Sequence, residues 1–277
     1  MDNSFKIAVC QMLVVDDKAK NVEKAVDLIG EAARSGADMV VLPEMFNCPY
    51  ESEKFPLYAE NRDNSETLKA VSSAAREHGV YLVAGSIPEL DNDKIYNTSF
   101  IMNPKGEIIG FHRKMHLFDV DVPDEITFKE SETVTAGDDI TVLDTDLARI
   151  GVAVCYDIRF PELSKLMALE GTEIMVLPGA FNMTTGPAHW EILIRSRAID
   201  NQFFLAAASS ARNTSSSYVA YGHSMIVDPW GKMLAKAGSD EEIIYADIHL
   251  DRLKEVHSQI PVLANRRLDI YDLKRKK

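Results

Sequence analysis

Apolar residues along this chain recur at two alternating spacings. Short apolar runs at residues 6–11 and 39–42 predict buried strands, and apolar positions between 22 and 33 recur at the spacing of one helix face. A second helix is predicted to begin at Ser65, a favoured N-cap residue, and to end at Gly79, after which another apolar run resumes a strand. Strands that alternate with helices indicate an α/β fold.

Turn residues predict that some neighbouring strands run antiparallel. Residues 103–106, Asn-Pro-Lys-Gly, join two apolar runs and have the composition of a type I turn with glycine in its fourth position. Such a turn makes a hairpin. The predicted sheets are therefore mixed and not purely parallel.

Three segments of the first half of the chain have near copies in the second half, in the same order. The pairs are 99–109 with 224–234, 40–47 with 175–182, and 7–10 with 152–155. We interpret them as two pseudo-equivalent halves. Two similar sheets packed face to face, with helices outside, would form four layers. No linker separates the halves, so residues 1–277 are predicted to form a single domain.

Composition limits the classes of function. With 277 residues, 46% hydrophobic and 26% charged, the chain has ample material for a core. A net charge of -13 argues against nucleic-acid binding, which needs a basic face. The three cysteines, Cys10, Cys48 and Cys155, have no CxxC spacing and favour a reducing compartment. The start of the chain does not resemble a signal peptide and no run reaches membrane-span length, so we predict a cytoplasmic protein without membrane contact.

Cys155 is the first candidate for chemistry. It ends the apolar run 150–154 and enters a polar turn before Pro161, a favoured first residue of a helix. A position near a helix N-terminus favours thiolate over thiol. Because a cysteine that ends a strand is commonly inert packing, the assignment depends on other residues.

Glu44 and Lys114 are the candidates for the remaining chemistry. Glu44 follows the apolar run 40–43, where a half-buried carboxylate with a raised pKa would serve as a proton shuttle. Lys114 follows a strand and would be a fixed cation for an oxyanion. Taken singly, each has the alternative of a solvated surface residue.

Histidines offer two further alternatives. His112 and His116, with Asp119 beyond, have a spacing that zinc ligands use. This segment follows a strand and lacks helical periodicity, so we predict no metal site. A Cys-His-Asp triad through His189 or His223 also stays open, although neither carries a recognisable signature.

Three short motifs carry a family resemblance. They are Leu42-Pro43-Glu44, His112-Arg113-Lys114 and Cys155-Tyr156-Asp157, in this order. Together they resemble the nitrilase superfamily of carbon–nitrogen hydrolases, and segments along nearly the whole chain are most similar to its omega-amidase branch. The resemblance implies an αββα sandwich of two mixed sheets with pseudo-two-fold halves. It also implies a homodimer.

The resemblance implies a role for each site residue. Cys155 would be the nucleophile, Glu44 the general base and then acid, Lys114 the transition-state cation, and Glu130 a second catalytic carboxylate that holds Lys114 or the substrate. The backbone N–H of Tyr156 would join Lys114 in binding the oxyanion. No cofactor is implied.

The expected substrate also follows from the resemblance. It is a small-molecule amide, the terminal amide of 2-oxoglutaramate or 2-oxosuccinamate, released as 2-oxo acid and ammonia through a Cys155 thioester. Arg159 is a candidate partner for the free carboxylate, with an Arg159–Asp157 ion pair as the alternative. Tyr50, Phe181 and Thr185 are further candidates for the substrate pocket, and Phe181 is equally a candidate for the core.

Two other functions stay open at this point. One is another activity of the superfamily: nitrilase, N-carbamoyl amidase or deaminated glutathione amidase. The other is a non-catalytic dimeric binding module that keeps the fold. The second is disfavoured because all four catalytic positions hold competent residue types.

Overall fold

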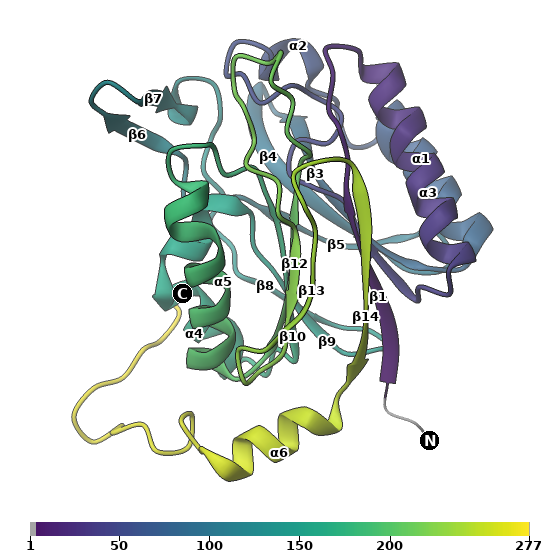
Figure 1. Cartoon of the computed structure of the whole chain (residues 1–277). Helices are drawn as coiled ribbons and strands as arrows, with labels where there is room; N and C mark the ends of the chain where they lie inside the picture. Colours follow the sequence, from purple (N-terminus) through teal and green to yellow (C-terminus); the bar gives the residue numbers. More distant parts are fainter. Residues whose placement is uncertain (1–3, 277) are drawn as a thin grey trace.

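Two six-stranded mixed sheets form the centre of the computed structural model, which describes residues 4–276 (Figure 1). The first sheet has the order β14-β1-β2-β3-β4-β5. Its strands are β1 (Ser4–Gln11), β2 (Met39–Val41), β3 (Tyr81–Asp91), β4 (Lys94–Met102), β5 (Ile108–Arg113) and β14 (Glu242–His249). The second has the order β13-β12-β11-β10-β9-β8. Its strands are β8 (Thr141–Asp144), β9 (Arg149–Val152), β10 (Ile174–Gly179), β11 (Phe204–Ser209), β12 (Met225–Val227) and β13 (Met233–Lys236).

The two sheets repeat one pairing pattern. From β14 to β5 the successive pairs are antiparallel, parallel, parallel, antiparallel and antiparallel. The pairs from β8 to β13 follow the same series. Strand β1 therefore corresponds to β9, β2 to β10, and the β4–β5 hairpin to β12–β13. The predicted duplication is confirmed. The pair 7–10 with 152–155 is wrong by two residues, because Ala8 and Gly151 occupy matching places beside Val40 and Met175, so residues 7–10 correspond to 150–153.

Three apolar layers hold the sheets and helices together. Side chains of both sheets, among them Ile7 and Val9 of β1 and Ile150 and Val152 of β9, pack between the sheets. Helices α1 (Lys18–Arg34) and α3 (Glu66–His78) cover the outer face of the first sheet. Helices α4 (Pro161–Leu169) and α5 (Gly186–Asn201) cover that of the second (Figure 1). The predicted αββα sandwich is confirmed.

The predicted helix ends follow from local chemistry. Ser65 caps α3 by accepting a hydrogen bond from the Leu68 amide, and Gly79 ends it with φ of 67°. Pro161 is the first residue of α4. Gly106 closes the β4–β5 turn through a bond from its N–H to the Asn103 carbonyl. These ends agree with the sequence predictions.

The remaining elements lie around the sandwich. They are α2 (Phe55–Tyr58), the 3₁₀ turns η1 (Glu130–Glu132) and η2 (Cys155–Arg159), the hairpin of β6 (Asp119–Val122) and β7 (Ile126–Lys129), and α6 (Asp251–Gln259). Within residues 4–276, no helix is both long and apolar enough to cross a bilayer. Residues 1–3, on which the signal-peptide prediction partly rests, lie outside the described part.

Candidate active site

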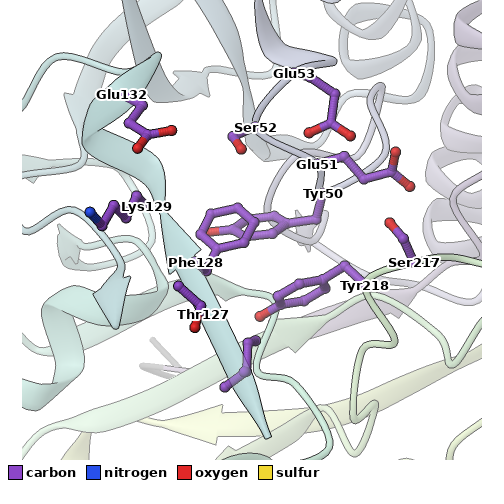
Figure 2. A pocket seen from close by; sticks show the side chains of 11 residues that line it. Tyr50, Glu51, Ser52, Glu53, Thr127, Phe128, Lys129, Glu132, Ser217 and Tyr218 are labelled. Carbon is purple, nitrogen blue, oxygen red and sulfur yellow. The ribbon is translucent and has the colours of Figure 1, made fainter. Parts of the chain in front are cut away.

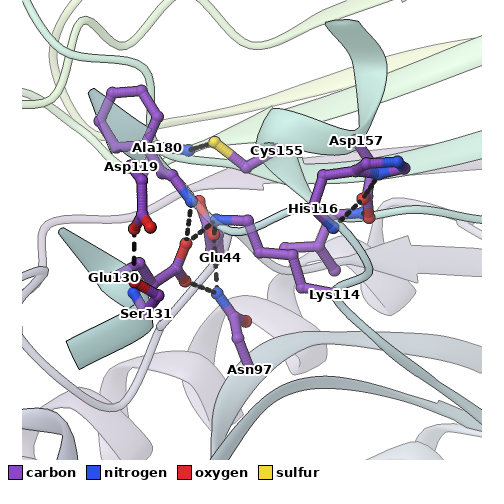
Figure 3. Close-up of polar contacts among 12 residues, drawn as sticks. Glu44, Asn97, Lys114, His116, Asp119, Glu130, Ser131, Cys155, Asp157 and Ala180 are labelled. Carbon is purple, nitrogen blue, oxygen red and sulfur yellow. Dashed lines mark hydrogen bonds and ion pairs between the residues drawn. The ribbon is translucent and has the colours of Figure 1, made fainter. Parts of the chain in front are cut away.

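Strand ends from both sheets bring four polar side chains into one buried cluster (Figure 3). Glu44 follows β2, Lys114 follows β5, and Cys155 follows β9. Glu130 is the first residue of η1, immediately after β7. All four candidate catalytic residues from the sequence therefore converge, although they are far apart along the chain.

Lys114 is the centre of this cluster. Its Nζ lies 2.9 Å from Glu44 Oε1 and 2.7 Å from Glu130 Oε2, and it donates to the Tyr50 hydroxyl at 3.1 Å. The side chains of Lys114, Glu44 and Glu130 are all 0% exposed. The prediction that Glu44 is half-buried is thus wrong, because the packed sheets enclose its side chain completely.

Asn97 bridges the two carboxylates and was missed by the sequence analysis. Its Nδ2 donates to Glu44 Oε1 at 2.8 Å and to Glu130 Oε1 at 3.0 Å. Asn97 is buried within strand β4. Asparagine is depleted in strands, so a polar amide inside an apolar strand was the one signal that could have indicated it.

The cluster changes the proton affinities of its members. Burial raises the pKa of Glu44. The negative charge of Glu130 raises it further, and the positive charge of Lys114 opposes both effects. Burial would lower the pKa of Lys114, but the two carboxylates outweigh it and raise that pKa. Lys114 therefore keeps its charge, while Glu44 binds a proton more readily than an exposed glutamate.

Cys155 occupies a strained turn. It is the first residue of η2, is 4% exposed, and has a φ of 46°, in the left-handed region that non-glycine residues rarely adopt. The Ala180 amide donates to its Sγ at 3.4 Å. Burial raises the pKa of the thiol well above its ordinary value, and Glu44 raises it further. Burial and Glu44 therefore favour the neutral thiol, in the direction opposite to the one expected from a position near a helix N-terminus.

The histidines of the zinc alternative bind an aspartate. His112 Nε2 lies 3.1 Å from Asp157 Oδ2. His116 Nδ1 lies 2.7 Å from Asp157 Oδ1 (Figure 3). Asp119 instead accepts from the Ser131 amide. In the part of the chain that the structure describes, no three His, Cys, Asp or Glu side chains are placed to hold a metal ion. Sequence spacing alone did not reveal the role of Asp157.

The histidines of the triad alternative lie elsewhere. His189 Nδ1 contacts Arg159 Nη1 at 3.1 Å, and His223 Nδ1 contacts the Ala237 carbonyl at 3.2 Å. Neither is bonded to Cys155 among residues 4–276. The candidate base next to Cys155 is therefore the carboxylate of Glu44, which acts on the pKa of the thiol.

The candidate pocket residues differ in their positions. Tyr50 lies in the cluster itself, with its hydroxyl 3.1 Å from Lys114 Nζ and 3.4 Å from Glu44 Oε1. Phe181 is buried against Trp190, with ring centroids 4.9 Å apart, and so belongs to the core on that side. The Thr185 hydroxyl donates to Asn182 at the start of α5, away from the cluster.

Arg159 lies beside the nucleophile without an acidic partner. Its guanidinium stands 4.8 Å from the Phe181 ring centroid, and the Cys155 thiol is close enough to influence its pKa. The alternative Arg159–Asp157 ion pair is wrong, since Asp157 is bound by His112 and His116. No carboxylate within the described residues forms an ion pair with Arg159.

Three aromatic rings, those of Tyr50, Phe128 and Tyr218, gather at an outer cavity (Figure 2). The ring centroid of Tyr50 lies 5.4 Å from that of Phe128 and 4.7 Å from that of Tyr218. All three rings line an outer cavity of about 510 Å³, whose wall includes the charged side chains of Glu51, Glu53, Lys129 and Glu132. A much smaller cavity, about 30 Å³, adjoins Glu44 and Tyr218 on the inner side.

Known proteins resemble this chain over almost its entire length. The sequence model of the family described as carbon–nitrogen hydrolase matches residues 6–258. Human omega-amidase NIT2 is 50% identical over 274 residues, 99% of each chain. Nitrilase homolog 2 of Dictyostelium discoideum is 53% identical over 271 residues, 97% of this chain and 82% of the relative. The crystal structure of Saccharomyces cerevisiae Nit3, described as a member of branch 10 of the nitrilase superfamily, superposes with a TM-score of 0.88 at 43% identity, covering 95% of this chain and 97% of the other.

Proposed function

The chain belongs to the nitrilase superfamily of carbon–nitrogen hydrolases, in its omega-amidase branch, and we propose that it hydrolyses the terminal amide of a small dicarboxylate monoamide. It is an amidase that acts on C–N bonds. The proposed substrates are 2-oxoglutaramate and 2-oxosuccinamate, each yielding a 2-oxo acid and ammonia. The observation that carries the proposal is the buried Glu44–Lys114–Glu130 cluster beside Cys155, with the unpaired Arg159 cation close by.

The first proposed step is acylation of Cys155. Glu44 accepts the thiol proton, the sulfur attacks the amide carbonyl, and an S–C bond forms. The raised pKa of Glu44 supports this assignment, since it makes that carboxylate a stronger base toward the thiol proton. Within residues 4–276, Glu44 Oε2 is buried without a hydrogen-bond partner, so one carboxylate oxygen is free for the proton.

Stabilisation of the oxyanion is assigned to Lys114 and to the backbone of Tyr156. The Lys114 ammonium is desolvated and held between two carboxylates, so it needs no reorganisation during the reaction. The Tyr156 N–H follows Cys155 at the start of η2 and is paired with no acceptor in the described chain. Glu130 acts on Lys114, because its Oε2 lies 2.7 Å from Nζ and also accepts from the Phe118 amide.

Acylation is complete when the C–N bond breaks and ammonia leaves with the proton that Glu44 took from the thiol. The second proposed step is hydrolysis of the resulting thioester. Glu44 then accepts a proton from water as the hydroxide adds to the acyl carbon, and that proton returns to the sulfur when the 2-oxo acid leaves. The net reaction is amide plus water to acid plus ammonia. No redox partner is needed.

Recognition of the free carboxylate is assigned to Arg159. An arginine that is partly buried beside the nucleophile, without an acidic partner, is suited to bidentate binding of a carboxylate. Phe181 supports the guanidinium plane from one side. Tyr50 would border the amide end of the substrate, since its hydroxyl contacts Lys114. Thr185 is proposed only as a contact to the outer part of the substrate.

Exposed apolar side chains and free cysteines bear on the assembly and location of the protein. Three large apolar side chains of the second half, Leu169 on α4 and Ile192 and Ile199 on α5, are exposed by 40%, 66% and 47%. An apolar helix face of this kind is suited to pairing with a second copy of the chain, so we propose a homodimer. The free thiols of all three cysteines support a reducing, cytoplasmic location. We keep residues 1–277 as one domain.

The test is ammonia release from 2-oxoglutaramate by wild type, by Cys155→Ala, and by wild type treated with a chelator. Turnover by wild type that the chelator does not change and that Cys155→Ala abolishes is expected. Undiminished turnover by Cys155→Ala would remove the nucleophile assignment. Chelator sensitivity would restore the metal hypothesis.

Substrate class is tested by rates on one enzyme sample. Omega-amides with a free carboxylate are expected to react faster than neutral amides, nitriles and N-carbamoyl acids. Arg159→Met should remove the preference for the carboxylate while leaving the neutral amides unaffected. Faster reaction with nitriles or carbamoyl acids in wild type would assign the chain another activity of the superfamily, and no reaction with any of them would favour the binding module.

A further inference from the structure

The carboxylate of Asp157 joins two segments that carry opposite sides of the active site. Asp157 lies two residues after Cys155, in η2. His112 lies two residues before Lys114 and His116 two residues after it. Both histidines bind Asp157, so one carboxylate contacts the Lys114 segment on either side of the lysine.

Four donors converge on this carboxylate. Asp157 Oδ2 accepts from His112 Nε2 at 3.1 Å and from the Val154 amide at 3.0 Å. Asp157 Oδ1 accepts from the amide of His116 at 2.9 Å and from its Nδ1 at 2.7 Å. Both oxygens are therefore saturated, and the side chain is completely buried. An ionised carboxylate is the side chain suited to accept four such bonds.

The two histidines are themselves held in place. His112 is buried, and its Nδ1 lies 3.1 Å from Thr141 Oγ1 on β8. The His116 ring stacks on Phe160 with centroids 3.6 Å apart and an interplanar angle of 11°. The bonds to Asp157 thus connect packed elements of both sheets, and the contact cannot shift without moving η2 or the segment after β5.

The same carboxylate fixes the backbone on both sides of the nucleophile. Its Oδ2 receives the Val154 amide, and the Asp157 amide donates back to the Val154 carbonyl at 3.0 Å. Cys155 stands inside this reciprocal pair with a φ of 46°. A strained backbone persists only where its surroundings hold it, and these bonds supply that support.

We propose that Asp157, His112 and His116 form a positioning clamp that fixes the Cys155 sulfur relative to the Lys114 ammonium. The three residues act through Cys155 and Lys114 and do not touch the reacting atoms. The inference rests on the proposed roles of those two residues. Its consequence is that donors must occupy specific atoms of each histidine: the Nε2 position at 112 and the Nδ1 position at 116.

Amide side chains test these positions separately. The amide nitrogen of asparagine reaches about the place of histidine Nδ1, and that of glutamine reaches about the place of Nε2. His116→Asn should keep kcat within about threefold of wild type, whereas His116→Gln should lose about 10- to 100-fold in kcat with KM nearly unchanged. At position 112 the order reverses, so His112→Gln should retain activity and His112→Asn should lose it.

Thermal melting of the four variants separates positioning from folding. The clamp predicts that kcat follows the donor position and not the melting temperature, and that Asp157→Asn, which replaces an acceptor oxygen with a donor, is as slow as the poorer member of each pair. Equal kcat within each pair, or losses that only follow melting temperature, would overturn it.

Alkylation of Cys155 by iodoacetamide, followed by mass spectrometry of its peptide, gives a readout that needs no substrate. His116→Gln and His112→Asn should slow alkylation about tenfold relative to their matched partners, because Glu44 and Lys114 no longer face the thiol correctly. Identical rates would contradict the clamp even if wild type failed on every amide. Failure on amides with the predicted alkylation pattern would instead refute the proposed function alone.

Discussion

Cys10 and Cys155 lie near the ends of corresponding strands in the two halves but have different surroundings. The strand registers match Cys10 with Ala153 in the duplicated fold, two residues before Cys155. Both follow an apolar run on equivalent strands, β1 and β9. Strand β1 continues past Cys10, which pairs with Ile243 of β14, and its side chain packs among apolar residues under α1. Strand β9 ends at Val152, so Cys155 enters a left-handed turn next to the carboxylate cluster.

The difference shows that reactivity here comes from strand length and surroundings and not from local sequence. Burial raises the pKa of both thiols. Only Cys155 has an ionisable base and a cation close by, since Glu44 and Lys114 both act on its pKa. Cys10 is affected by burial and by Glu31 alone. Similar sequence therefore produces one packing residue and one candidate nucleophile.

Removal of the Cys155 sulfur should have the largest effect. Cys155→Ala is expected to lower kcat by about 10⁴-fold or more, since loss of a nucleophile leaves only binding and oxyanion stabilisation. Ammonia release under saturating 2-oxoglutaramate measures this. A loss below tenfold would mean that Cys155 is no more reactive than Cys10.

Removal of the cation tests the second difference between the two cysteines. Lys114→Met keeps the length of the side chain and deletes its charge, and should slow acylation by about 10²-fold or more. Single-turnover formation of the Cys155 thioester is the measurement. An unchanged rate would show that Lys114 serves Glu44 and Glu130 only as a structural counter-ion.

Gly85 on β3 and its counterpart on β11 allow the two halves to be compared at a second pair of equivalent strands. It has φ of +32°, and an added Cβ would lie 2.0 Å from the carbonyl oxygen of Pro43, directly before Glu44. The equivalent place in β11 is Ala208, which tolerates a side chain. Gly85→Ala should lower the free energy of unfolding by about 3 kcal/mol. Ala208→Gly, compared by urea denaturation, should cost about 1 kcal/mol.

Activity should depend on pH through the carboxylate that Cys10 lacks. Glu44 must be ionised to accept the thiol proton, and its pKa is raised above 4.5, so kcat/KM should fall as pH drops through that raised value. Asn97→Leu removes a donor to Glu44, stabilises its protonated form, and should move the acid limb up by about 1 pH unit. A limb that stays in place would argue that Glu44 is not the base.

Cys10 provides the smallest expected effect. Cys10→Ala deletes one buried sulfur and should cost about 1 kcal/mol of stability without changing kcat or KM. Chemical denaturation and steady-state kinetics test both parts. A loss of activity with unchanged stability would break the comparison, because it would assign Cys10 a role beyond packing.

By itself, the sequence determined the alternation of strands and helices, the ends of α3 and α4, the repeated halves, and the residue types of the site. Periodicity, helix caps and turns depend on neighbours within a few positions, so they can be predicted from short stretches of the sequence. The three triplets that contain Glu44, Lys114 and Cys155 also indicated the family, because their residues and order can be read without any knowledge of contacts.

Only the tertiary structure decided how these groups are protonated and held. The complete burial of Glu44, the bridge of Asn97 to both carboxylates, and the binding of Asp157 by His112 and His116 depend on contacts between segments 33 to 53 positions apart. Proton affinity is set by burial and by charges brought close in space, which no local pattern specifies. The position near a helix N-terminus therefore favoured a thiolate, whereas burial between the packed sheets raises the pKa of the thiol and favours its neutral form.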